Sequence, residues 1–430
     1  MKKNLQTLRR KLLLICMACA PWWGLAQVQA QTLEALIQET LSSHPSTQSQ
    51  RSQVASATAG VDSARWQFYP TPSVSFEKAN ARTSDPLYRG DSQVTILGLR
   101  QPLYTGGRLS AGADKAQAIL DQSQASLDEA RLQLGLRVVQ AYGEWLAAHG
   151  KTLAIQQSEK THARLRDQVQ RRIDEGMSAD SDLMLALTRL EAVRSDLLAA
   201  RAQGEIVLAR LGQLLGRPIE QAALVNTLAL PRTVQAQATE LLEQALQISA
   251  AVKKARSQIR VQEATISELR ADLLPEVYLR AERQFGNFNF SDGAPESRLF
   301  VGVNSRFGAG LSASSNVAAA RSQLEAAVAE VQGQTRLINE QVLADHALAL
   351  SSEQRLTSVR ASLRWAQSVY ESYDRQFLAG RRTWLDVMNA AREVAQTETL
   401  IADLISTQVV ASWRLSFYTR GIEAVTPGSP

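Results

Sequence analysis

The chain repeats itself, and this internal duplication limits the folds open to it more than any other feature. Pro72 is matched by Pro275, and Leu109 by Leu311, with an alanine-rich run after each leucine. Two later landmarks recur in the same order, namely Gly176 with Gly380 and Asp182-Leu183-Met184 with Asp386-Val387-Met388. Their near-constant offset of about 203 residues predicts two structural repeats, 31–216 and 237–420, with a linker at 217–236 and a tail at 421–430.

Both repeats show the same order of segments. Each begins with a helical segment and continues with two short strands, a very long helix, a glycine turn and a second helix. The helical segments are 33–66, about 107–172 and 180–215 in the first repeat, and 237–272, about 311–378 and 384–419 in the second. The sequence therefore predicts a mainly α-helical protomer with a small β part.

The long helices are predicted from composition and period. Residues 108–172 contain no proline and are rich in Ala, Leu, Gln, Arg and Glu, which are strong helix formers. Leu109, Ala113, Ala116 and Leu120 step by four and three, which is typical of a coiled-coil seam with small side chains. About 65 helical residues extend ~100 Å, a length that suits rods, bundles and tunnels.

Four shorter segments alternate apolar and polar residues over about nine residues, as transmembrane β-strands with a wet interior do. The predicted apolar faces are Val74 and Phe76; Val94, Ile96 and Gly98; Val277, Leu279 and Ala281; and Leu299, Val301 and Val303. Alternation alone fits a half-buried hairpin on a soluble helical protein equally well. Four strands cannot close a barrel, which needs about eight, and open edges are not tolerated in lipid. The membrane interpretation therefore requires several chains, and three would supply twelve strands.

The N-terminus predicts export. Five basic residues precede an apolar run at Leu12–Ala20, and small residues follow, so residues 1–30 read as a signal peptide cleaved after Ala26 or Ala30. Both cysteines lie in this segment, which excludes disulfides, thiol catalysis and Cys-ligated zinc from the mature chain. Without the five leader bases, 47 − 5 = 42 basic residues balance 42 acidic ones. A neutral chain argues against a nucleic-acid partner.

Enzyme motifs are missing from the sequence. His149-Gly150-Lys151-Thr152 imitates the end of a phosphate loop, but Trp145 occupies the place of the required glycine. The four histidines are scattered, and the acidic residues are spread among bases along helices. We therefore predict no catalytic residue, no cofactor and no metal site.

With these features the chain resembles the TolC family of outer-membrane export channels over nearly the whole mature sequence. The resemblance includes the duplicated order of segments and Gly106-Gly107-Arg108 before the first long helix, and it is most specific from Phe377 to Ala390. It implies a homotrimer, with a twelve-stranded barrel among the outer-membrane lipids of a Gram-negative bacterium and an α-helical tunnel across the periplasm. The periplasmic end would open when an adaptor protein and an inner-membrane transporter engage it.

The resemblance also implies roles for residues at the tunnel entrance. Asp386 aligns with an acid that rings the entrance, where three copies would favour cations. Asn389 stands where better-known members carry a second acid, so the ring would be weaker. Arg382 aligns with an arginine that holds the gate closed and Asp182 with its acidic partner, while Phe377 replaces a tyrosine of that network. A more easily opened gate is expected; for Asp182 and Arg382, solvated charges near helix starts are an equal alternative.

The two turns are expected at the periplasmic tip. Gly176 and Gly380 suit left-handed positions that end a helix. By the resemblance, these turns and the nearby Leu385 would dock the helical hairpins of an adaptor.

The same resemblance also implies a class of cargo. The stretch from Phe377 to Ala390 looks most like members that serve type I secretion of proteins, including large adhesins, with an inner-membrane ABC transporter. The exit duct of a multidrug efflux pump, served by an RND transporter, is an alternative. A periplasmic coiled-coil adaptor or scaffold is an alternative of another class, although an adaptor would show one helical hairpin rather than a duplicated one.

Overall fold

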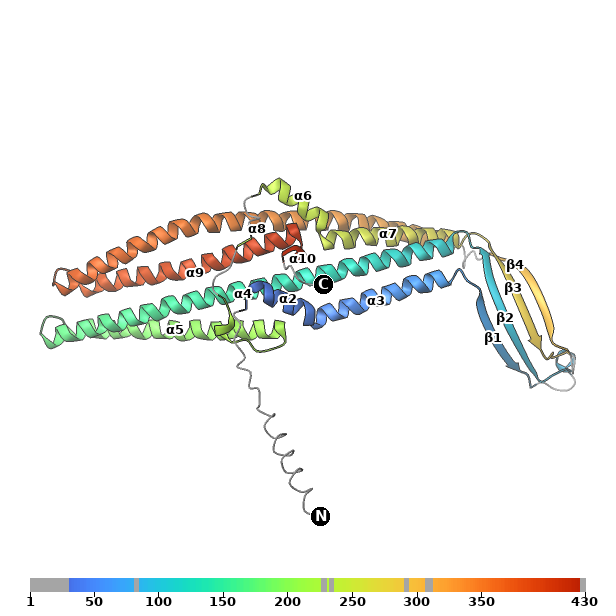
Figure 1. Ribbon diagram of the computed structural model, residues 1–430, viewed down its shortest axis with the longest axis horizontal. Helices are drawn as coiled ribbons and strands as arrows, with labels where there is room; N and C mark the ends of the chain where they lie inside the picture. Colours follow the sequence, from blue (N-terminus) through green and yellow to red (C-terminus); the bar gives the residue numbers. More distant parts are fainter. Residues whose placement is uncertain are drawn as a thin grey trace, which may run out of the picture.

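The protein is an elongated helical body with a small sheet at one end (Figure 1). The computed structural model describes residues 31–80, 85–225, 230–231, 236–289, 294–305 and 312–425. The predicted leader, with both candidate cleavage sites, lies outside the described residues, as do residues 426–430. The predicted class, mainly α with a small β part, is confirmed.

Two helices of equal length form the body. α4 (Arg108–Asp174) and α8 (Ser312–Leu378) have 67 residues each, which corresponds to about 100 Å. Each turns back into an antiparallel helix, α5 (Asp180–Leu215) and α9 (Trp384–Arg420). The predicted bounds of these helices agree with the structure to within about two residues, because nothing between them interrupts the helical pattern.

The predicted helical segments before the strands, 33–66 and 237–272, are each two helices in the structure. The first divides into α2 (Leu33–Ser43) and α3 (Pro45–Trp66), the second into α6 (Ala238–Ile248) and α7 (Ala250–Ala271). His44 is extended because the ring of Pro45 disfavours helical backbone in the residue before it. Ser249 ends α6 and caps α7, where its hydroxyl accepts from the Val252 N–H at 3.3 Å.

The remaining helical elements are short, namely η1 (Pro86–Tyr88), η2 (Gln221–Ala223) and α10 (Ile422–Val425). The largest apolar core joins α2, α4, α5 and α9 in the middle of the body, around the fully buried Tyr142, Trp145 and Phe417. None of the helices in the described ranges combines the length and apolar character needed to cross a membrane.

The sheet contains β1 (Thr71–Lys78), β2 (Gln93–Tyr104), β3 (Glu276–Phe285) and β4 (Glu296–Asn304). The strands pair in chain order and all are antiparallel. β2 and β3, which come from different halves of the chain, are the central pair. β1 and β4 therefore each have one edge without a strand among the described residues.

Candidate functional site

One face of the sheet is apolar and exposed. Residues paired across strands share a face, so Val74, Leu97 and Arg283 lie in one row, and Leu99, Ala281 and Leu299 in the next. Val74 is 73% exposed and Leu299 is 69% exposed. In water such a continuous apolar face is unfavourable, and it marks a surface that contacts lipid or another protein.

The predicted apolar face of β2 was wrong. Ile96 pairs with Ser75 and Gln284, which places it with Val94 and Gly98 on the polar face of the sheet. The outward apolar residues of β2 are Leu97 and Leu99. Because β2 carries apolar side chains on both faces, its alternation could not decide between them. For β1, β3 and β4 the pairing agrees with the predicted faces.

The opposite face is polar, and most of its charges lie in pairs. Arg100 bonds Glu276 at 3.1 Å and lies over the Tyr278 ring at 4.0 Å. Arg280 contacts Glu282 at 3.2 Å and lies over Phe300. Such a surface suits water, so the two faces of the sheet suit two different environments.

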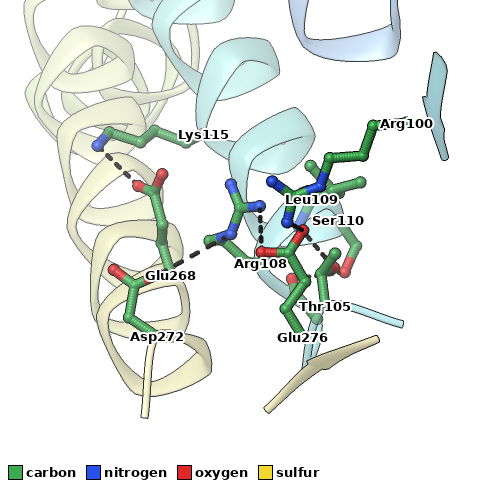
Figure 2. Close-up of polar contacts among 10 residues, drawn as sticks. Arg100, Thr105, Arg108, Leu109, Ser110, Lys115, Glu268, Asp272 and Glu276 are labelled. Atoms are coloured by element: carbon green, nitrogen blue, oxygen red, sulfur yellow. Dashed lines mark hydrogen bonds and ion pairs between the residues drawn. The ribbon is translucent and has the colours of Figure 1, made fainter. Parts of the chain in front are cut away.

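Charged contacts also fix the sheet to the helical body (Figure 2). Arg108 opens α4 and lies 3.9 Å from both Asp272 and Glu276, while Lys115 bonds Glu268 at 3.0 Å. Gly106 has φ +62, and a Cβ there would lie 2.7 Å from Leu274, so the turn from β2 into α4 needs glycine. This junction ties β2, β3, α4 and α7 together.

The far end of the body consists of two turns with matching backbone hydrogen bonds. Gly176 and Gly380 have φ +70 and +74, as predicted for left-handed positions. The Met177 N–H donates to the Arg172 carbonyl at 2.7 Å, and the Arg381 N–H donates to the Gln376 carbonyl at 2.8 Å. Each is the six-to-one bond of a Schellman motif, which ends the long helix sharply.

The start of α9 holds Asp386 and Arg382 together. The Thr383 hydroxyl accepts from the Asp386 N–H at 3.3 Å and donates to the Asp386 carboxylate at 2.8 Å, as a capping residue does. Arg382 lies 3.5 Å from this carboxylate and 4.2 Å from the centre of the Tyr373 ring. The Thr383 hydrogen bond and then the Arg382 charge hold the pKa of Asp386 below its ordinary value.

Phe377 belongs to an apolar core at the tip. It is 2% exposed and packs with Leu165, Trp384, Val387 and other residues of α4, α5, α8 and α9. The guanidinium of Arg172 lies 4.5 Å from the centre of its ring. Both helical hairpins are thus joined at the tip by one small core.

A further contact between the hairpins was missed by sequence reasoning. Arg164 of α4 hydrogen-bonds Asp374 of α8 at 3.3 Å and also bonds the Tyr370 hydroxyl. Burial raises the pKa of Tyr370, so its hydroxyl stays protonated at neutral pH. These partners are about 210 residues apart in sequence, and no motif links them.

The other predicted site residues surround these contacts. Asp182 lies half-buried in the first turn of α5, Asn389 is exposed on α9, and Leu385 is 42% exposed near the tip. Within one protomer the described contacts of Arg382 run to Asp386, Gln376 and Tyr373, and none of them involves Asp182. In the described ranges no three His, Cys, Asp or Glu side chains are placed to hold a metal ion.

Comparisons with known proteins agree with this arrangement. The family described as "Outer membrane efflux protein" matches residues 36–217 and 241–419. The outer membrane protein TolC of Vibrio cholerae is 26% identical over 276 residues, which covers 60% of this chain and 61% of that relative.

Solved structures share the fold. VceC, an outer membrane protein of Vibrio cholerae, has a TM-score of 0.77 at 16% identity, covering 90% of this chain and 96% of that one. The CmeC outer membrane channel of Campylobacter jejuni has a TM-score of 0.77 at 14% identity, covering 92% and 87%.

Proposed function

The chain belongs to the outer membrane efflux protein family, and from this premise we propose that three copies form a passive exit duct from the periplasm to the cell exterior. Its location is the outer membrane, from which the helical body extends into the periplasm. The observation that carries the proposal is the two-faced sheet, with an exposed apolar face, a charged face and two edges that pair with no other strand of the described ranges. Closing those edges with other copies would place the apolar face in lipid and the charges in water.

The pairing inside one protomer indicates how copies would join. Leu99 lies nine residues before α4, and Val303 lies nine residues before α8. Ala281 lies ten residues after α7, and Phe76 lies ten residues after α3. Val303 is therefore the counterpart of Leu99, and Phe76 is the counterpart of Ala281, in the two repeats at 31–216 and 237–420. Because Leu99 pairs with Ala281 within one protomer, Val303 of one copy would pair with Phe76 of the next. This register keeps both apolar side chains on the outer face.

The gate is proposed at the tip, where the two hairpins meet. Arg382 and Asp386 brace the start of α9, and Arg164 ties α4 to α8 through Asp374 and Tyr370. In the trimer, Asp182 of a neighbouring copy would be the acidic partner of Arg382, and Asp386 with Asn389 would form the constriction. Phe377, which lacks a hydroxyl, would leave the gate easier to open.

For the cargo, we propose protein substrates of type I secretion, delivered by an ABC transporter through an adaptor that docks near Gly176, Gly380 and Leu385. Support comes from the stretch Phe377–Ala390 alone. The alternative cargo is the set of small molecules exported by a multidrug pump. Deleting the gene separates the two, because loss of secreted protein with unchanged antibiotic susceptibility supports type I secretion and the reverse supports drug efflux.

The duct itself is tested by fractionation and by conductance. We expect the protein in the outer-membrane fraction as a heat-modifiable trimer that conducts ions across a planar bilayer. A monomer that stays soluble without detergent and never conducts would refute the proposal and would favour the periplasmic scaffold.

A further inference from the structure

We propose that the outer face of the sheet binds a membrane lipid with a phosphate-bearing headgroup, and that Arg283 receives the phosphate. This inference rests on the proposed function, because it requires the sheet to lie in the outer membrane. It adds a ligand site on the lipid side of the barrel, away from the duct and its gate.

The apolar part of the site is a shallow hollow of about 470 Å³ over Ala281. The small side chain of Ala281 lies in register between Leu99 and Leu299, which are 45% and 69% exposed. Leu97 and Arg283 form the next row toward the free end of the sheet. The leucine side chains at the sides of this hollow are larger than the alanine at its base, so an acyl chain can lie between them.

The charged side chains on this outer face of the described strands are all positive. Outward positions of the described strands include two cations, Lys78 and Arg283, and no acid, as their pairing shows. The strand acids, which are Glu77, Glu276, Glu282 and Glu296, all lie on the polar face. The contact described for Arg283 is the Phe285 ring, whose centre is 5.5 Å from its guanidinium carbon. An arginine on a lipid-facing surface therefore lacks a carboxylate partner within the described residues.

The position of Arg283 along β3 determines which part of a lipid molecule it can contact. It lies two residues before the end of β3, at the end of the sheet away from the helices (Figure 1). Two strand residues span about 7 Å, a distance that an arginine side chain covers when it extends toward an interface. At that level the available anion is a headgroup phosphate, which guanidinium binds through two parallel hydrogen bonds.

A titration tests the site. Purified protein in detergent is titrated with bis-phosphorylated lipid A, and the thermal midpoint of trimer dissociation is recorded. The midpoint of the wild type should rise, and Arg283→Gln should need about tenfold more lipid for half of that rise, as expected for one lost charge-assisted hydrogen bond. Arg283→Lys should fall between them, because it keeps the charge but not the paired hydrogen bonds.

Matched controls separate this site from general charge effects. Arg298 adjoins Ser297, the partner of Arg283, but lies on the polar face and bonds Glu296. Arg298→Gln should therefore titrate like the wild type, while dephosphorylated lipid A and inorganic phosphate should not raise the midpoint. Equal half-saturation for a conducting Arg283→Gln trimer would overturn the lipid site alone. A wild-type protein that forms no conducting trimer would overturn the proposed function and this site with it.

Discussion

Single polar side chains add to the apolar core that joins the two hairpins at the tip. Arg164 is one polar link between α4 and α8 there, with side-chain exposures of 50% for Arg164 and 15% for Asp374. A partly exposed ion pair contributes at most about 1 kcal/mol. The contact is therefore strong enough to bias a gate and weak enough to be released.

Replacing Arg164 should favour the open state. We expect Arg164→Gln to raise the open-to-closed ratio in single-channel recordings by up to about fivefold, the factor that corresponds to 1 kcal/mol. Arg194→Gln is the matched control, because Arg194 bonds Glu159 and Glu191 within the first hairpin. An equal open-to-closed ratio for Arg164→Gln and Arg194→Gln would show that Arg164 does not hold the gate.

The Arg382–Asp386 contact should be insensitive to mild acid. The pKa of Asp386 is lowered in the folded protein, so its ion pair stabilises above the unfolded pKa of about 3.9 and is lost only as pH falls through the lower folded pKa. Arg382→Ser should open more often than wild type, by a similar factor at pH 7 and about pH 5. If the difference in opening frequency between Arg382→Ser and wild type disappears by about pH 5, Asp386 is already protonated there. If the two proteins open equally often at both pH values, Arg382 does not hold the gate.

The helices and turns show how far sequence reasoning reaches. The long helices were predicted closely, because residue type and period act locally along an uninterrupted run. The break before Pro45 also has a local cause, the proline ring. The face of β2 and the Arg164–Asp374 contact had none, since both depend on which strands and helices become neighbours.

The turn at Gly380 offers a test of the helix end. Its φ of +74 is unfavourable for residues with a Cβ, so Gly380→Ala should lower the free energy of unfolding by about 1 kcal/mol. Gly380→Asn should cost less, because asparagine tolerates the left-handed region better. Denaturant titration measures the free energy of unfolding of the wild type and both variants. Equal values for all three would contradict a left-handed backbone at Gly380.

At the scale of the whole molecule, the proposed trimer makes each protomer one third of a closed ring. Among the described residues, a single protomer has no strand paired to the outer edge of either β1 or β4, and it exposes an apolar face. Unpaired strand edges are unfavourable in lipid until other copies pair with them, and the apolar face is unfavourable in water until lipid covers it. Trimer closure is thus the claim on which the duct, its gate and the lipid site all depend.

Cysteine cross-linking between copies tests that claim most directly. Both native cysteines lie within residues 1–30, so a mature chain cleaved as proposed provides a cysteine-free background. Under mild oxidation, Phe76→Cys combined with Val303→Cys should give a covalent trimer on non-reducing gels, because paired strand positions lie within disulfide reach. Phe76→Cys with Val301→Cys, two residues out of register, should cross-link poorly. Monomers from both pairs, or equal cross-linking of both, would contradict the account.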